Sequence, residues 1–357
     1  MSETFTHEAS DIPFLHVYAR PSTPEKQRPL EFIRAAESGP EGIACVDDVA
    51  RAALLALQVY EATPSRAVLQ TARAWLDFVI YMQEPDGRFV NFIRDRAGRK
   101  NRIGRTSYAG GQWWTSRALW ALAAGWRVTG DDRYLRLFER GRLAPVRDLK
   151  ITAVQALALM ELYVAHPSER LRLRICALCD RLLKHGPEYL RDRAGVDMIK
   201  PWGYHQLHAL ARAARLFQRP DYLAACERTV QRVIEPLVAG AFSLVEPSER
   251  APQCAYDVST IMLGLAELHH ATNKEQYRAL ALACAGWLYG ANPSGEALYD
   301  PHTGCCADGL SDDKRSLNVN CGAESTIEAG FMELARRRLA AEHAPRALVA
   351  PLAAVLG

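Results

Sequence analysis

The chain has 357 residues, of which 49% are hydrophobic, 24% charged and 8% aromatic. This composition is typical of a globular protein with a large buried core. The 44 Lys and Arg residues nearly balance the 41 Asp and Glu residues, which gives a formal net charge of +3. The balance removes the electrostatic argument for nucleic acid or an anionic membrane as a partner.

No run of about 18 apolar residues occurs, so the sequence predicts no transmembrane helix. The first residues, 1–5, lack the basic and then apolar pattern of a secretory signal, and we expect a cytoplasmic protein. The nine cysteines are odd in number and lie among apolar helical residues. This usage favours reduced, mostly buried thiols over a disulfide framework.

Amphipathic helices of about 15–20 residues dominate the pattern and are joined by short turns. Links such as 61–65 and 218–221 are short enough to make consecutive helices antiparallel hairpins. Strand signals are sparse, and the best of them, 87–93, suggests a small hairpin. The periodicity predicts twelve helices, over 28–37, 47–62, 66–84, 111–128, 131–141, 150–165, 168–186, 203–217, 220–239, 257–271, 274–290 and 322–341.

Twelve helices in hairpins predict an all-α fold, either an open solenoid or six hairpins closed into an (α/α)6 toroid. No repeat of fixed period occurs, which favours the toroid. We expect one domain over 1–357, with a helical core at about 28–341, and a cleft built at one end of the ring from the long loops. These irregular segments recur about every second helix, at 86–110, 187–202, 240–256 and 291–321.

Adjacent carboxylates open the helix predicted at 47–62. Asp47 and Asp48 precede an apolar run, and Arg51 follows three residues after Asp48. The structural interpretation is a helix cap with an i,i+3 ion pair. The functional interpretation is that one carboxylate activates a water molecule while the other orients it, since a carboxylate base needs a neighbour that tunes its pKa. Arg51 is then a candidate substrate contact.

Glu324 lies in the first turn of the last predicted helix, directly after a polar turn with Asn318, Asn320 and Gly322. An acidic residue at this place is stabilised by the helix dipole whatever its function. The polar turn also suits a general acid that faces the Asp pair across the ring. In that interpretation Asn320 contacts the substrate.

Turn formers and chemically active side chains occur together over 298–310. Tyr299 and His302 are candidate substrate contacts. Asp308 is an alternative to Glu324 as the general acid, and the sequence does not decide between them.

A zinc site is suggested by Cys305, Cys306 and His302. Adjacent cysteines chelate poorly, however, and no further pair completes four ligands. Cys176 and Cys179 form a CxxC inside a predicted helix without a glycine turn or a second pair, which favours buried thiols. We therefore expect no metal. No βαβ alternation or glycine-rich phosphate loop occurs either, and we expect no cofactor.

Aromatic and histidine side chains mark two more loop–helix junctions. Trp113 and Trp114 either pack in the core or stack on a sugar ring. Tyr204 precedes His205 and His208, which stand at i,i+3 on one helix face. These histidines are either satisfied structural residues or acid–base and ligand groups. All five are candidate substrate contacts.

A series of motifs in this order resembles the helical domain that is fused to, or encoded beside, some bacterial glycosyltransferases. That domain belongs to the six-hairpin glycosidase-like superfamily, and the resemblance spans about 40–335. The motifs are Asp47-Asp48-Val49-Ala50-Arg51-Ala52, Asp86-Gly87-Arg88-Phe89-Val90-Asn91-Phe92, Arg117-Ala118-Leu119-Trp120-Ala121-Leu122, Tyr299-Asp300 with Thr303-Gly304, Asp308-Gly309-Leu310 and Asn320 to Thr326.

The chain also resembles family-nine glycoside hydrolases more loosely, in part through Gly290-Ala291-Asn292-Pro293. This resemblance implies that Asp47 and Asp48 form the pair that positions the water and that Glu324 is the acid. We therefore expect a glycoside hydrolase that acts on an oligo- or polysaccharide. Inversion is expected if the carboxylates stand about 6.5–9.5 Å apart, whereas a separation of about 5 Å would indicate retention.

Three alternatives stay open. A polysaccharide lyase would use Tyr204, His205 or His208 as base and the basic cluster 94–105 to neutralise a uronate. A sugar epimerase would use His205 or His302 for proton transfer. A non-catalytic glycan-binding module would serve a glycosyltransferase partner. The expected ligand is a saccharide in every case, and neither nucleic acid nor a membrane is an expected partner.

Overall fold

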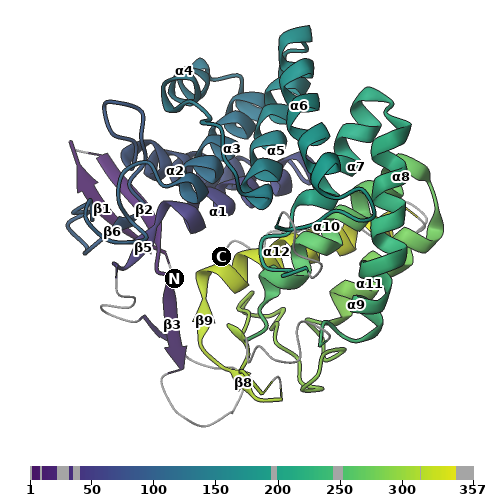
Figure 1. The fold of residues 1–357 in the computed structure, drawn as a ribbon. Helices are drawn as coiled ribbons and strands as arrows, with labels where there is room; N and C mark the ends of the chain where they lie inside the picture. The colour runs from purple at the N-terminus through teal and green to yellow at the C-terminus, as the bar shows by residue number, and fades with distance from the viewer. Residues whose placement is uncertain are drawn as a thin grey trace.

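The computed structural model describes residues 2–8, 10–21, 32–34, 41–193, 199–243, 252–313 and 315–342. Six helices form a closed inner ring, in which each helix packs on the next and the last packs on the first (Figure 1). In ring order they are α1 (Val46–Ala62), α3 (Gln112–Thr129), α5 (Leu149–Ala165), α7 (Gln206–Phe217), α10 (Ala255–Thr272) and α12 (Ala323–Ala341).

The inner helices are buried nearly all round, and the outer helices are amphipathic. Every residue of α5 from Leu149 to Leu162 is buried, as expected for a helix enclosed by protein. In α4 only Tyr134 and Phe138 are buried. The outer helices are α2 (Arg66–Tyr81), α4 (Asp132–Gly141), α6 (Glu169–His185), α8 (Pro220–Thr229), α9 (Glu235–Ala239) and α11 (Glu275–Gly286).

Helices α8 and α9 belong to one run that a π-helical turn, η1 (Val230–Ile234), widens. Pro236 follows directly and has no N–H to donate, which explains a local break in the α-helical pattern. With this run counted once, eleven of the twelve predicted helices are confirmed, and so is the all-α toroid.

The predicted helix at 28–37 is wrong where the structure describes it. Phe32–Arg34 forms strand β4, which pairs antiparallel with β3 (Tyr18–Pro21), while the rest of the segment lies outside the described residues. Aromatic and β-branched side chains suit a strand, and pairing with β3 outweighs the helical periodicity. The hairpin expected at 87–93 is also different: β6 (Phe92–Ile93) pairs with β5 (Ala44–Cys45).

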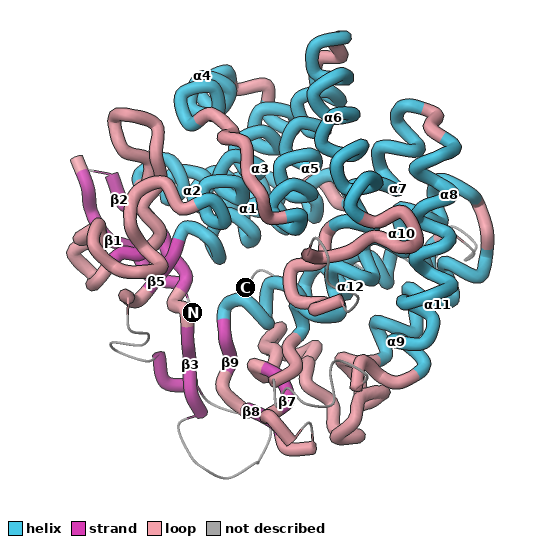
Figure 2. The backbone as a smooth tube through the Cα atoms, in the orientation of Figure 1, coloured by secondary structure: helices cyan, strands magenta, loops and turns pink. Residues whose placement is uncertain are grey.

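Short strands and long loops gather beside the helical ring, where α1 and α12 begin (Figure 2). Strand β9 (Cys321–Gly322) leads into α12 and pairs with β3. The other strands are β1 (Ser2–His7), which pairs with β2 (Ser10–Leu15), and β7 (Gly309–Leu310), which pairs with β8 (Leu317–Asn318). In the described part of the chain no helix is long and apolar enough to cross a membrane.

Glu161 near the end of α5 joins three helices of the toroid. Its carboxylate pairs with Arg127 of α3 and with Arg212 of α7, at 2.6 Å for the latter. Burial raises the pKa of Glu161, but the two guanidinium groups outweigh it and lower that pKa to about 2. The carboxylate is therefore ionised in the folded protein at neutral pH.

We expect Glu161→Gln to lower the free energy of unfolding by about 3–5 kcal/mol at pH 7, because it leaves the buried Arg212 guanidinium without its anion and leaves Arg127 with Glu61 alone. Since the folded-state pKa lies below the ordinary value, this stabilisation is present above about pH 5 and is lost as the pH falls toward 2. Urea unfolding at several pH values measures the difference. Glu169→Gln, on the exposed side of α6, is the matched control and should leave stability unchanged.

Candidate active site

The first turns of the inner helices α1, α10 and α12, the segments before them and the segment before α7 surround a cavity of about 1290 Å³. Seven carboxylates and one lysine line it among the described residues, together with Asn320. They are Asp47, Asp48, Asp257, Asp308, Asp312, Asp313, Glu324 and Lys200. The Asp pair, Glu324, Asp308 and Asn320, all singled out from the sequence, therefore meet in one place.

Arg51 lies beneath the cavity floor and is almost fully buried. Its guanidinium contacts Asp48 Oδ1 at 2.6 Å, Glu324 Oε2 at 3.0 Å and Glu328 Oε1 at 2.8 Å, and Asp47 Oδ2 lies 3.6 Å away. Arg51 does not line the cavity, and its guanidinium already pairs with these carboxylates. The expectation that it contacts substrate is corrected to a role in holding α1 against α12.

Arg117 of α3 is the second buried cation, and sequence reasoning missed it. It pairs with Asp47 Oδ2 and donates a hydrogen bond to the Tyr256 hydroxyl. Its guanidinium also lies 5.0 Å from the centre of the Trp113 ring and 5.8 Å from that of Trp202, which are cation–π distances. A basic residue inside the apolar helix at 111–128 was the signal that could have revealed it.

Two carboxylic acids at the cavity have pKa values raised toward neutrality. Burial raises the pKa of Asp48 to about 6, against the effect of Arg51. Burial, followed by the charges of Glu324 and Asp48, raises the pKa of Asp308 to about 6 as well. Perturbed carboxyl groups in a cleft are typical of catalytic sites.

Asp257 at the start of α10 is a third such group, and sequence reasoning missed it. Burial raises its pKa to about 6, although the Cys254 N–H donates a hydrogen bond of 2.8 Å to its carboxylate. This bond caps the first turn of α10. The position Asp257 holds, three residues after the cap, is the sequence signal for that role.

Asp308 is held by main-chain contacts rather than by a cation. Its N–H donates to the carbonyls of Asn318 and Asn320, at 3.0 and 2.7 Å, and Asn318 Nδ2 donates to its Oδ2 at 3.2 Å. A Cβ atom on Gly322 would lie 2.1 Å from Asp308 Oδ1, so a larger residue there would displace the Asp308 carboxyl group. Within the described ranges Asp308 has no ion pair, and the charges beside it are negative.

Glu324, in contrast to Asp308, contacts a cation and a side-chain hydrogen-bond donor. Its Oε2 pairs with Arg51, and its Oε1 accepts a hydrogen bond of 3.1 Å from Trp202 Nε1. Its side chain is 29% exposed, against 7% for Asp48 and 18% for Asp47, so Glu324 is the most accessible of the three carboxyl groups.

The aromatic faces at the cavity differ from those expected. Trp114 is buried and its Nε1 donates to the Phe89 carbonyl at 2.8 Å. Trp113 packs on Trp202, with ring centres 5.3 Å apart. The exposed aromatic side chains that line the cavity are Trp202 and Tyr18, neither of which was a sequence-based candidate.

The candidate histidines lie away from the cavity. Tyr204 is fully buried, and His205 is buried with its Nε2 3.2 Å from the Tyr256 hydroxyl. Burial lowers the pKa of His205 well below its ordinary value, and it lowers the pKa of His208 to about 4. His208 faces a separate cavity of about 260 Å³, which is lined by the second halves of the inner helices. In this arrangement none of the three reaches a molecule in the large cavity.

The segment 298–310 also differs from expectation. Tyr299 is buried and His302 is exposed, and neither lines the cavity.

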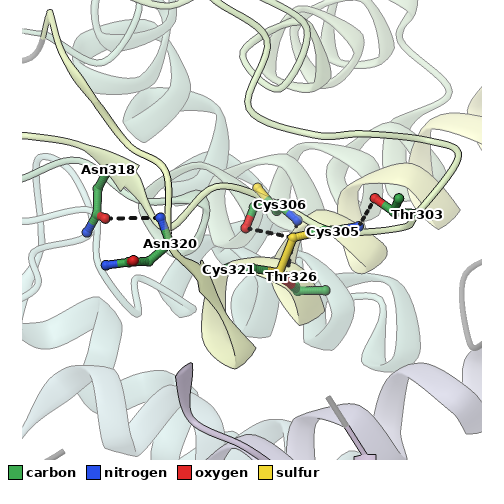
Figure 3. Close-up of a disulfide and its surroundings, with 7 residues drawn as sticks. All are labelled: Thr303, Cys305, Cys306, Asn318, Asn320, Cys321 and Thr326. Carbon is green, nitrogen blue, oxygen red and sulfur yellow. Dashed lines mark hydrogen bonds between the residues drawn. A yellow bond between two sulfur atoms is a disulfide. The ribbon is translucent and has the colours of Figure 1, made fainter. Parts of the chain in front are cut away.

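A disulfide joins Cys305 to Cys321 (Figure 3), which corrects the expectation of thiols only, because folding brings together two sulfurs 16 positions apart. The other seven cysteines form no disulfide in the described part of the chain. No group of three or more His, Cys, Asp or Glu within the described ranges is arranged to hold a metal.

No family model and no curated protein matches the sequence. Solved structures do match. A sugar epimerase from a ruminal bacterium is 13% identical, with a TM-score of 0.61 over 86% of this chain and 90% of its own. The family 9 endoglucanase J30 is 15% identical, with a TM-score of 0.54 over 82% and 72%.

The GH76A alpha-1,6-mannanase from Salegentibacter sp. HEL1_6 is 11% identical, with a TM-score of 0.57 over 85% of this chain and 95% of its own. At these identities the likeness shows a shared fold and leaves the chemistry to the residues of each site. The chain therefore has the six-hairpin α/α toroid fold of these structures.

Proposed function

We propose that this chain is a carbohydrate-active enzyme that hydrolyses a glycosidic bond, with Asp308 as general acid and Glu324 as general base. The observation that carries the proposal is the contrast between two carboxyl groups at one cavity. Asp308 lies among negative charges without a cation, whereas Glu324 is bound by Arg51 and Trp202. Environments that separate two carboxyl groups in this way distinguish an acid from a base.

In the proposed reaction Asp308 donates its proton to the glycosidic oxygen as the bond between that oxygen and the anomeric carbon breaks. Glu324 takes a proton from a water molecule, whose oxygen bonds to the anomeric carbon. The transition state resembles an oxocarbenium ion, and the surrounding carboxylates would stabilise its positive charge. The exposed faces of Trp202 and Tyr18 would stack on sugar rings.

This assignment differs from the resemblance, in which the Asp pair acts as base and Glu324 as acid. Arg51 holds Asp48 Oδ1 and Glu324 Oε2 on the same nitrogen, at 2.6 and 3.0 Å. These oxygens are therefore closer than the about 6.5–9.5 Å that admits a water molecule between an inverting pair. With Asp308 as acid, inversion stays a prediction, which NMR of the first-formed anomer would decide.

The side chains at the cavity support the alternatives less well. A sugar epimerase of the kind expected needs His205 or His302, and neither lines the cavity. A uronate lyase needs cations, but none of the basic residues over 94–105 lines the cavity, and four of them are paired with Glu3, Glu84 and Asp95. A binding module gives no reason for acids with raised pKa values.

The expected setting of the enzyme is also a proposal. The resemblance suggests a glycosyltransferase as functional partner. One domain over the whole chain is consistent with the closed ring of inner helices.

We expect Asp308→Asn and Glu324→Gln each to lower kcat/KM by about 100-fold or more on the substrate that is turned over, because each removes one proton-transfer group. Reducing-end release from a panel of glucans, mannans and uronate polymers is the measurement. Asp86→Asn, in an exposed ion pair with Arg88, is the control and should retain wild-type activity. Wild-type activity in both site variants would reject the assignment.

The pH profile should depend on Asp308. A general acid is active only while protonated, so with a pKa of about 6 for Asp308 we expect kcat/KM to fall as the pH rises above about 6. In Asp308→Asn the residual activity should lose this alkaline limb. An unchanged limb in the variant would assign the acid to another group.

Neutral saccharides should be better substrates than uronate polymers. The surplus of carboxylates over lysine at the cavity repels an anionic chain, and this repulsion is screened by salt. Comparing kcat/KM for a neutral polymer and its uronate counterpart, at low and at high ionic strength, measures the effect. Preference for the uronate, with unsaturated products, would instead indicate a lyase.

A further inference from the structure

The Cys305–Cys321 disulfide lies equally close in sequence to both proposed catalytic carboxylates. Cys305 stands three residues before Asp308, and Cys321 stands three residues before Glu324. The bond joins the loop that carries the acid to strand β9, from which the helix with the base begins (Figure 3). Cys321 also pairs with Ala19 of β3.

We propose that this disulfide is a positioning element of the site, which holds Asp308 at its working distance from the substrate, and that its reduction lowers activity without unfolding the ring. This inference rests on the proposed function for the role of Asp308. The two cysteines touch no substrate and act through the loop between them.

The contacts around the disulfide explain why it acts on Asp308. Between Cys305 and Cys321 the regular structure of the described residues is limited to the two-residue strands β7 and β8. The Asp308 N–H bonds to Asn320, next to Cys321, and its Oδ1 touches Gly322. Reduction removes the covalent tie between the two segments, which raises the conformational entropy of the loop and lets these contacts open more often.

The inner ring does not depend on this bond. Ser325 Oγ donates to the Asp308 carbonyl at 2.8 Å, and Arg51 continues to hold Glu324 and Glu328. Reduction should therefore move the acid relative to the base rather than dissolve the site. A catalytic group displaced by about 1 Å can cost about 100-fold in rate.

The reaction needs an external dithiol, and Cys305 is the reachable sulfur, since it is partly exposed while Cys321 is 3% exposed. A dithiol thiolate attacks Cys305 Sγ, the bond to Cys321 breaks, and Cys321 leaves as a thiolate that takes up a proton. The second thiol of the reagent then attacks the mixed disulfide and releases Cys305. The protein gains two thiols, and the dithiol becomes a cyclic disulfide.

The test compares the protein before and after dithiothreitol, with the thiols counted by alkylation and mass spectrometry. We expect kcat to fall about 10- to 100-fold on reduction, with KM changed less than about threefold. The alkaline limb of the pH profile should move to lower pH, because a freer Asp308 is better solvated. Hydrogen exchange should quicken at 306–310 and 317–322 but not in α5 or α10.

The double variant Cys305→Ser/Cys321→Ser should behave like the reduced protein, and dithiothreitol should not change its kcat. Cys176→Ser, which removes a free thiol of the outer helix α6, should keep the wild-type response. Since reduction of the wild type is the primary measurement, a double variant that folds poorly does not decide the outcome.

The outcomes separate the two proposals. Free thiols at both positions in protein purified without reductant would overturn the inference, as would complete reduction with unchanged kcat and exchange. If neither the oxidised nor the reduced protein turns over any substrate of the panel, the proposed hydrolase function is rejected. Faster exchange at 306–310 on reduction would still support the positioning role in that case.

Discussion

The site and the closure of the ring depend on one buried cation, Arg51. A buried charge is tolerated only when it is paired and hydrogen-bonded, and Arg51 finds its partners on both the first and the last helix of the ring. Glu324 and Glu328 stand one helical turn apart on α12, so both reach the same guanidinium only in one register of α12 against α1. The same contacts hold the Glu324 side chain at the cavity.

The charge balance at this end of the toroid adds to the effect of burial in raising the pKa of Asp308. Arg51 and Arg117 pair with four carboxylates, and neither guanidinium pairs with Asp308. The helix dipoles at the first turns of the inner helices favour anions here, which lets several carboxylates share a small volume. A further cation beside Asp308 would lower its pKa and remove the proton donor. The shortage of cations is thus a condition of the proposed chemistry.

Much of the fold could be predicted from the sequence, because helical periodicity, short links and the absence of a repeat are local signals. The Asp pair and Glu324 could be predicted as well, since acids at helix starts are visible in the chain. What the sequence did not reveal depends on tertiary contacts. Arg117 looked like part of an apolar helix, and the strand at Phe32–Arg34 exists through its pairing with β3. The Cys305–Cys321 bond likewise needs two loops to meet.

The two proposed catalytic groups differ in how they are anchored, and this difference follows from what each must do. A base that activates water needs a fixed direction, and Glu324 has one because it starts α12 and is bound from two sides. An acid must meet a glycosidic oxygen whose place depends on the sugar that binds. Asp308 sits in a loop with two-residue strands, where small movements cost little. A loop of this kind positions a side chain poorly unless a further contact restricts its movement. The disulfide three residues before Asp308 is placed to restrict the movement of this loop.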